Sequence, residues 1–159
     1  IGFESPNYGA LDGIEQNSNW KANRVDQYVA AVEKIQRHGI TVNGCLVLGL
    51  DGAGPEQFKD AMRFVRDSGL YDVQITYMTP FPGTPLWDRL SEEGRILSKE
   101  ATERCTLFDI NFQPDSMSVT ELEEGFLKII GTLYSPRFVA DRSRRFKKHL
   151  RSRIREQRA

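Results

Sequence analysis

The chain has 159 residues, of which 39% are apolar, and its 22 Lys and Arg residues are balanced by 22 Asp and Glu residues. This size and composition allow one modest hydrophobic core and exclude a second full domain. Because the sequence contains no apolar run of about eighteen residues and no charged-then-apolar leader, we expect neither a membrane span nor secretion, and a cytoplasmic setting is the default.

The first predicted element is a strand that ends at Glu4 and Ser5. The chain opens with Ile-Gly-Phe-Glu-Ser-Pro and has no initiator methionine. Pro6 disfavours the helical region for the residue before it, so the strand ends there. We interpret this opening as the tail of a longer strand and expect the chain to be the C-terminal piece of a longer protein. A Gly- and Asn-rich passage follows, with a short helix expected at 11–15.

The next stretch predicts a helix followed by a buried strand. Apolar residues recur at three- and four-residue spacing over 25–35, Asn23 is placed to cap the start, and Gly39 ends the run. The following segment, Ile40–Leu50, is almost continuously apolar. A strand with one wet face would alternate, so this segment predicts a parallel strand buried on both faces.

A second helix and a third strand follow. Pro55 is suited to the first helical position and Gly69 to the end of the helix. Its inner face is predicted to consist of Phe58, Met62 and Val65. The segment Asp72–Met78 then predicts a strand.

A proline-rich loop follows this third strand. Its sequence, Met78-Thr-Pro-Phe-Pro-Gly-Thr-Pro-Leu86, holds three prolines, and proline restricts φ and removes an amide donor, so the loop has one rigid path. In α/β domains this end of a strand is where ligands bind; the alternative is a rigid connector without a ligand. A helix is expected over Pro85–Glu93, capped by Thr84 and stopped by Gly94.

The resulting order, β-α-β-α-β-α with short connections, predicts parallel strands joined by right-handed crossovers. Three such strands make about half of a barrel or of a doubly wound sheet. Because an isolated half would leave sheet edges exposed, we expect the missing partner strands to lie upstream.

Beyond Leu97 the pattern changes to a loop-rich segment and two helices. Apolar residues alternate over 108–112, which predicts a short strand, and Ser118 with Glu121 forms a capping box that opens a helix. The inner face of this helix is predicted to hold Leu122, Phe126, Ile129, Ile130 and Leu133. Ser135-Pro136 begins a last helix whose stripe is predicted to be Phe138, Arg142, Phe146, Leu150 and Ile154.

The last helix is strongly basic. From residue 136 onward ten Lys and Arg residues stand against two acidic ones, a net charge of +8, so the first 135 residues carry −8. Clustered cations favour nucleic-acid phosphates, but the apolar stripe favours docking on protein. We prefer docking and keep RNA or another polyanion as the alternative.

Several residues at the strand ends are candidates for binding. Glu4 with Ser5 is suited to the hydroxyls of a ribose, the alternative being a surface carboxylate beside a turn. Val47 and Gly49 offer an apolar platform for a flat ring. Asp51 is the polar group best placed to reach into a ligand site at the strand ends. The glycines of this loop match neither the G-x-G-x-x-G nor the P-loop pattern, which argues against phosphate binding.

Other kinds of chemistry have little support. His38 and His149 lie in helical segments, and no Ser-His-Asp, HExxH or paired-carboxylate arrangement occurs, so the catalytic residues remain unknown. Cys45 and Cys105 are the two cysteines and stand sixty positions apart. We expect buried thiols rather than a metal site.

Three motifs in this order resemble the radical S-adenosylmethionine superfamily: Ile1-Gly-Phe-Glu-Ser5, Gly44-Cys-Leu-Val-Leu-Gly-Leu-Asp51 and Pro80-Phe-Pro-Gly-Thr-Pro-Leu86. More narrowly, the chain is similar to the cobalamin-binding subgroup, in which a Glu-Ser or Glu-Thr pair ends the fourth barrel strand and a "PFPGTPL" loop follows the sixth. The segments around Asn111-Phe112 and Ser135-Pro136 are similar to the C-terminal extension of that subgroup.

The resemblance implies that residues 1–97 are the second half of a partial (β/α)6 TIM-like barrel and that 98–159 form a mainly helical extension. It also implies site roles. S-adenosylmethionine would be contacted by Glu4, Ser5, Val47, Gly49, Met78 and Thr79. The substrate side would be lined by Asp51, Tyr77, Phe81 and Gly83.

Two departures from the family pattern stand in this sequence. The family's G-x-I-x-G-x-x-E becomes Cys45-x-Val47-x-Gly49-x-x-Gly52, so its first glycine and its acid are unmatched. The C-x-x-x-C-x-x-C motif for the 4Fe-4S cluster and any cobalamin-binding domain are absent. Both are expected in the missing N-terminal half.

The sequence therefore predicts part of a radical enzyme, methyltransferase-like, that uses S-adenosylmethionine, a 4Fe-4S cluster and cobalamin on a small-molecule substrate. The complete protein would cleave S-adenosylmethionine reductively to a 5′-deoxyadenosyl radical, and this chain alone would be inactive. The alternatives are a different (β/α) enzyme with a nucleotide-like ligand, and a non-catalytic interaction module built on the basic helix.

Overall fold

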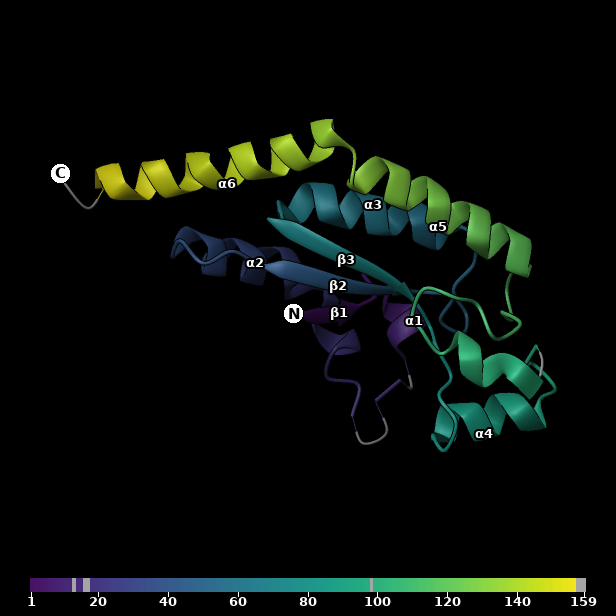
Figure 1. The fold of residues 1–159 in the computed structure, drawn as a ribbon. Coiled ribbons are helices and arrows are strands. Elements are labelled where there is room, and N and C mark those ends of the chain that lie inside the picture. Colours follow the sequence, from purple (N-terminus) through teal and green to yellow (C-terminus); the bar gives the residue numbers. More distant parts are fainter. Residues whose placement is uncertain (13, 16–17, 98, 157–159) are drawn as a thin grey trace.

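The computed structural model describes residues 1–12, 14–15, 18–97 and 99–156, and it has an α/β fold with C-terminal helices (Figure 1). Its elements in chain order are β1 (Gly2–Glu4), α1 (Tyr8–Leu11), the 3-10 helix η1 (Ala22–Gln27), α2 (Tyr28–Arg37), β2 (Asn43–Leu48), α3 (Glu56–Ser68), β3 (Asp72–Tyr77), α4 (Pro85–Glu92), the 3-10 helix η2 (Lys99–Arg104), α5 (Val119–Leu133) and α6 (Pro136–Glu156).

The three strands form one open, parallel sheet in the order β1-β2-β3. The register of β2 and β3 is regular, with Leu46 opposite Ile75 and Val47 opposite Thr76. The pairing of β1 with β2 shifts between Gly2 and Glu4. The parallel arrangement predicted from the β-α-β-α-β order is confirmed. A closed barrel is not shown, since the sheet among the described residues has three strands and free edges.

One face of the sheet carries the core. Phe3 of β1 packs against Tyr28 of α2 and Phe64 of α3, with ring centroids 4.9 and 5.2 Å away. Leu46 and Ile75, at matched positions of β2 and β3, are both 1% exposed in the same cluster. Because side chains alternate along a strand, Cys45, Val47 and Gln74 lie on the opposite face, where each is only half buried.

The starts of α4 and α5 follow the predicted caps, whereas two other predictions were wrong: α2 begins at Tyr28, behind η1 and without an Asn23 cap, and Pro55 is the N-cap residue of α3. The Thr84 hydroxyl accepts a hydrogen bond from the Trp87 amide at the start of α4. At α5 the Ser118 hydroxyl accepts from the Glu121 amide while the Glu121 carboxylate accepts from the Ser118 amide, a complete capping box. Proline lies at the first position of α4 and α6, where its missing amide costs no hydrogen bond.

Some element boundaries differ from prediction. The buried strand expected over Ile40–Leu50 is shortened to Asn43–Leu48, and Gly49, directly after its last residue, ends the extended run with a positive φ. The expected helix at 11–15 lies earlier, at Tyr8–Leu11, where the Asn7 side chain caps it.

The other differences concern the packing faces and the last loop. The strand expected over 108–112 was wrong: this segment makes one antiparallel bridge, Phe112 to Ile96. On α3 the most buried apolar residues are Ala61, Phe64 and Val65, whereas Phe58 and Met62 are half buried on the side facing α5.

Helix α6 is anchored by a buried cation. The Arg142 side chain is 5% exposed, donates hydrogen bonds to the carbonyls of Leu133 (2.8 Å) and Tyr71 (3.3 Å), and lies 3.5 Å from the Asp72 carboxylate. Nearby, the Phe146 and Tyr71 rings meet edge to face at 5.1 Å. These contacts fix the first half of α6, while its second half extends beyond the sheet (Figure 1).

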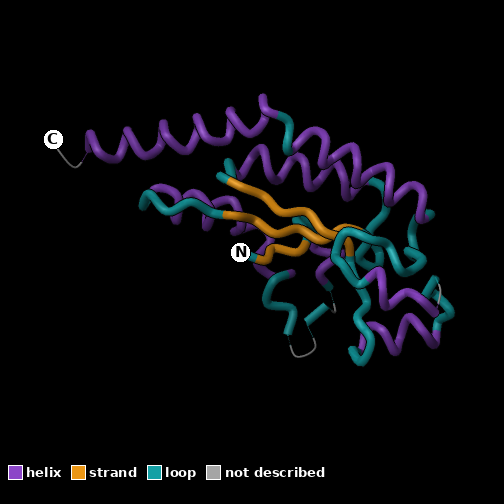
Figure 2. The backbone as a smooth tube through the Cα atoms, in the orientation of Figure 1, coloured by secondary structure: helices purple, strands orange, loops and turns teal. Residues whose placement is uncertain are grey.

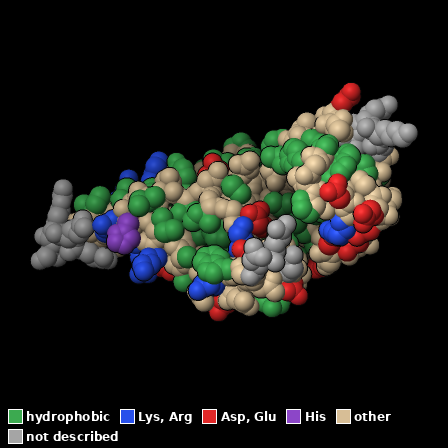
Figure 3. All heavy atoms as spheres, turned by 90° about the horizontal axis from the view of Figure 1, so that it is seen from below, with side chains coloured by type: hydrophobic (Ala, Val, Ile, Leu, Met, Phe, Trp, Pro, Cys, Tyr) green, Lys and Arg blue, Asp and Glu red, His purple; other side chains and the backbone are tan. Residues whose placement is uncertain are grey.

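The loops that follow the strands gather at one end of the sheet, beside α4 (Figure 2). Seen from below, Lys and Arg gather toward the end of the molecule where α6 terminates, and Asp and Glu gather toward the α4 end (Figure 3). Among the described residues, every helix falls short of the combined length and apolar character needed to traverse a bilayer.

Candidate functional site

The carboxyl ends of the three parallel strands lie at the same edge of the sheet. Glu4 ends β1, the Gly49–Gly54 loop follows β2, and Met78 follows β3. Such an edge is where open α/β sheets bind ligands. The residues at this edge therefore form the candidate site.

Glu4 has an unusual backbone. Its φ is +63°, a conformation that L-residues with a Cβ rarely adopt, and the β1–β2 register shifts at this position. The Glu4 carboxylate accepts a hydrogen bond from the Lys21 ammonium at 2.8 Å, and both side chains are about three-quarters buried. Local strain of this kind costs about 1–3 kcal/mol and clusters at functional sites.

Ser5 is held next to Glu4. It is 6% exposed, and its hydroxyl accepts a hydrogen bond from the amide of Asn7 at 3.1 Å. Asn7 is the N-cap residue of the short helix α1. The Ser5 side chain therefore has a structural partner in the loop that leaves β1.

A cavity of about 470 Å³ opens at this edge. Apolar side chains make most of its wall, with three charged groups at the rim. The lining residues are Ala10, Asp12, Ile14, Leu50, Asp51, Met78, Thr84, Pro85, Leu86 and Arg89. Its size is in the range of small-molecule and cofactor sites. Two carboxylates against one guanidinium make the rim net negative, which favours a ligand that carries positive charge.

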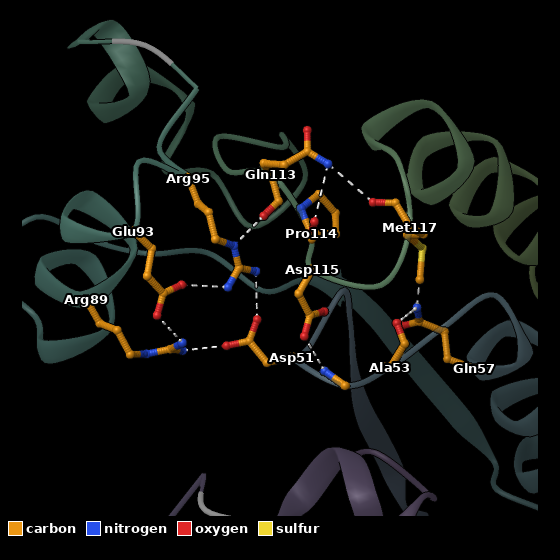
Figure 4. A network of polar contacts seen from close by, with 11 residues as sticks. Asp51, Ala53, Gln57, Arg89, Glu93, Arg95, Gln113, Pro114, Asp115 and Met117 are labelled. Atoms are coloured by element: carbon orange, nitrogen blue, oxygen red, sulfur yellow. Dashed lines mark hydrogen bonds and ion pairs between the residues drawn. The ribbon is translucent and has the colours of Figure 1, made fainter.

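Asp51 joins the β2 loop to the segment around α4 (Figure 4). Its carboxylate accepts hydrogen bonds from Arg89 at 2.5 Å and from Arg95 at 2.7 Å, and the Glu93 carboxylate pairs with the same two guanidinium groups at 3.2 and 2.9 Å. The result is a ring of two cations and two anions at the mouth of the cavity. It holds α4, which supplies Leu86 to the wall, against the end of β2.

The pKa values in this ring are shifted in favour of the charged forms. Burial alone would raise the pKa of the Asp51 carboxyl, but the hydrogen bonds from Arg95 and Arg89 outweigh it and lower the pKa below its ordinary value. The hydrogen bond with Asp51 raises the pKa of Arg89. At neutral pH the ring is therefore fully ionised, and Asp51 is not placed to act as a proton donor.

The segment after α4 is tied to the same loop. The Asp115 carboxylate accepts a hydrogen bond from the Gly52 amide at 2.9 Å. The buried Gln57 side chain accepts from the Gly49 amide at 2.8 Å. It also donates to the Met117 sulfur at 3.6 Å (Figure 4). Residues beyond 97 thus contribute to the architecture of the strand-end edge.

In addition to Glu4 and Ser5, three predicted cofactor-binding residues lie at this edge: Val47, Met78 and Thr79. Met78 is 6% exposed, lines the cavity, and donates its amide to the Leu48 carbonyl at 2.8 Å. Thr79 is nearly buried and donates its hydroxyl to the Tyr77 carbonyl at 3.2 Å. Val47 lies on the face of the sheet opposite the core, and its side chain is half buried there. Asp51, predicted for the substrate side, lines the cavity as well.

Two predicted residues are turned away from the cavity. The Tyr77 ring is stacked on Phe126 of α5 at 4.1 Å, on the helix-covered side, where burial raises its pKa. Gly49 has φ +83°, and a Cβ built on it would lie 2.9 Å from Leu122 and 3.1 Å from Phe112. The backbone of Gly49 therefore packs closely against Leu122 and Phe112, two buried side chains of the C-terminal segment.

Phe81 and Gly83 lie in the exposed bend of the proline-rich loop. The Phe81 side chain is 39% exposed, and its carbonyl accepts a hydrogen bond from the Thr84 hydroxyl at 2.6 Å. Gly83 has φ +79°, which explains the glycine in this turn. Both are near α4 but are not among the residues that line the cavity.

Sequence reasoning missed four contributors: Asp12, Lys21, Arg89 and Arg95. Lys21 lies in a segment without periodicity. Arg89 and Arg95 are 38 and 44 residues from their partner Asp51. Charges this far apart in the chain carry no local pattern that would have paired them.

No cluster of three or more His, Cys, Asp or Glu side chains suited to a metal ion occurs within the part of the chain that the structure describes. Cys45 is half buried on the open face of the sheet, with its thiol 3.9 Å from the Gln74 carbonyl oxygen. Cys105 is half buried near the Pro80 carbonyl at 3.6 Å. The expectation that both cysteines are fully buried was therefore only partly met.

Comparison with known proteins relates the chain to methyltransferases over most of its length. It is 26% identical to the bacteriochlorophyllide d C-12(1)-methyltransferase of Chlorobaculum tepidum over 134 residues, which are 84% of this chain and 28% of that protein. It is 32% identical to the hopanoid C-2 methylase of Rhodopseudomonas palustris over 103 residues, 65% of this chain and 19% of that protein.

An uncharacterized methyltransferase of Synechocystis sp. is 25% identical over 147 residues, 91% of this chain and 26% of that protein. The chain thus spans between 19% and 28% of the length of these three relatives. Residues 84–159 match the family described as a domain of unknown function, DUF4070. This match begins at the cap of α4 and includes Arg89 and Arg95.

Proposed function

We propose that this chain is the C-terminal part of a cobalamin-dependent radical S-adenosylmethionine methyltransferase, in which residues 1–97 complete the S-adenosylmethionine site and residues 98–159 brace it. The relation to methyltransferases supports the reaction class. The observation that carries the proposal is the shared edge, at which Glu4, Asp51 and Met78 follow three neighbouring parallel strands.

The residues at this edge fit S-adenosylmethionine chemically. Its ribose hydroxyls need an acceptor, which the Glu4 carboxylate supplies. Its adenine needs an apolar wall, for which Val47, Leu50 and Met78 are available. Its sulfonium and ammonium charges suit the net negative rim of the cavity. The backbone at Met78 and Thr79 is proposed to meet the edge of the adenine.

This chain is proposed to bind and orient, not to ligate the metal cofactors. Its two cysteines are fewer than the three thiolates that the proposed 4Fe-4S cluster requires, so cluster and cobalamin are assigned to another part of the complete protein. When bound, those cofactors supply the radical and methyl-transfer chemistry. The residues here hold S-adenosylmethionine, exclude water from it with the proline-rich loop, and present a small-molecule substrate from the α4 side.

Asp51 is proposed to act on the substrate side by positioning. Ionised and paired with Arg89 and Arg95, it fixes the α4 wall at the cavity mouth. Phe81 and Gly83, on the exposed bend before α4, are proposed to meet substrate in the complete enzyme. Tyr77 is proposed to support this loop indirectly, through its packing on α5.

The test is calorimetric titration of the complete protein with S-adenosylmethionine. Replacing Glu4 by Gln removes a charged hydrogen-bond acceptor and is expected to weaken binding by about 10- to 100-fold. Glu33→Gln is the matched control, since Glu33 is also a carboxylate paired with a cation, Arg37, but lies on α2. If the complete protein does not bind S-adenosylmethionine, or if both variants bind like the wild type, the proposed site is wrong.

A further inference from the structure

The outer side of α6 carries a straight row of exposed Arg and Lys side chains. Arg137, Arg144, Lys148 and Arg151 follow at intervals of seven, four and three residues, so at 3.6 residues per turn they fall within about one sixth of the helix circumference. Over fourteen residues the row is about 21 Å long. All four side chains are exposed.

This row lies opposite the docked side of the helix. Arg142 and Phe146, which hold α6 to the sheet and its flanking helices, are buried about half a turn away from the row. The predicted stripe of α6 is therefore partly covered by the rest of the chain: Arg142 and Phe146 are buried, Phe138 and Leu150 are half buried, and Ile154 is 41% exposed. The four cations are therefore exposed on the side away from the docked face, and α6 itself runs along the edge of the molecule (Figure 1).

Three of the four cations of the row, Arg137, Lys148 and Arg151, are not neutralised by the described part of the chain. Asp141 pairs with Arg144 at 3.4 Å and Arg145 at 2.9 Å. For Arg137, Lys147, Lys148 and Arg151, the described part of the chain contains no ion-pair partner within 4 Å. A shallow hollow beside the row is lined by Ala140, Ser143, Arg144, Lys147, Lys148, Arg151 and Ser152. Its small neutral residues let a flat surface approach the cations closely.

We propose that this row, the α6 basic row, binds the protein peripherally to an anionic lipid bilayer. A cluster of four or more Lys and Arg side chains on an amphipathic helix is suited to anionic headgroups, and each cation adds to the attraction. A straight array of four cations can touch a flat surface at once.

Nucleic acid is the less favoured partner. The described residues of the row and its hollow include no aromatic side chain on which unpaired bases could stack. The lipid surface demands only charge and flatness, which this side of α6 supplies. Insertion of the helix into the bilayer is not expected, since Arg142 and Phe146, at the centre of its stripe, are buried against the chain.

The experiment is vesicle co-sedimentation of the complete protein at low ionic strength. Phosphatidylcholine vesicles with 30% phosphatidylglycerol are compared with pure phosphatidylcholine. The triple variant Arg144→Gln, Lys148→Gln, Arg151→Gln is expected to lower partitioning on the order of a hundredfold, because each cation near such a surface contributes several-fold. Binding by the wild type is expected to fall steeply at about 0.5 M salt, where charges are screened within a few ångströms.

The matched control is Lys34→Gln, Arg37→Gln, Lys59→Gln, which removes three exposed cations from α2 and α3 and should bind like the wild type. Far-UV circular dichroism of both variants reports whether they fold. Equal loss in both variants, or equal binding to neutral and anionic vesicles, would overturn the proposal. So would salt-sensitive binding of a duplex RNA through the same row without vesicle binding. None of these results depends on S-adenosylmethionine binding.

Discussion

Gly49 offers a sharp test of how the C-terminal segment docks on the sheet. At φ +83°, an Ala would adopt a left-handed conformation that costs about 1–2 kcal/mol. Its methyl group would also lie 2.9 Å from Leu122 and 3.1 Å from Phe112, both fully buried, and overpacking of this kind costs about 1–3 kcal/mol. We expect Gly49→Ala to lower the free energy of unfolding by about 2–5 kcal/mol.

Gly52→Ala separates the two contributions. Gly52 has φ +73°, but no atom lies within 4 Å of a Cβ built on it, so only the conformational cost of about 1–2 kcal/mol applies. Urea unfolding followed by circular dichroism, with thermal melts as a second measure, compares the two variants. The overlap at Gly49 should place its melting temperature about 2–12 °C below that of Gly52→Ala. Equal stabilities would refute the close packing of Leu122 and Phe112 on the end of β2.

Three further predictions address other contacts. Asp51→Asn removes the carboxylate that Arg89 and Arg95 share and should cost about 1–2 kcal/mol of unfolding free energy at pH 7. Because folding lowers the pKa of Asp51, its contribution to stability is present above the ordinary carboxyl pKa of about 4 and is lost as pH falls through the folded value. A difference in stability between wild type and variant that persists at pH 2 would contradict this prediction. Ser118→Ala removes the α5 capping box and should cost about 1 kcal/mol in urea unfolding, whereas Ser118→Thr should restore most of it. Arg142→Met leaves the Leu133 carbonyl without its donor and should increase hydrogen exchange over α6; unchanged exchange there would show that Arg142 does not anchor the helix.

Local structure was largely readable from the sequence because its causes are local. Thr84 before Pro85 specified the start of α4, and the Ser118 and Glu121 pair specified the start of α5. The β-α-β-α-β order implied parallel strands, since only a crossover connects parallel neighbours. This order also placed the ends of all three strands at one edge, which is why Glu4 and Met78 could be named as site candidates.

The sidedness of individual residues was decided by tertiary packing. Tyr77 and Met78 are adjacent and point to opposite faces, but the chain alone does not tell which face the helices will cover. Docking of α5 made Tyr77 a core residue. Gly49, expected as a platform for a ring, was needed instead for close approach of the C-terminal segment.

By itself, then, the sequence determined the order of the three strands and of the main helices, the caps of α4 and α5, and the edge at which the strands end, because these depend on residues a few positions apart. Only the tertiary structure decided that Asp51 pairs with Arg89 and Arg95, that Arg142 is buried, and that one row of α6 cations faces outward. Charges act through space, and their partners are chosen by the packing that brings distant segments together.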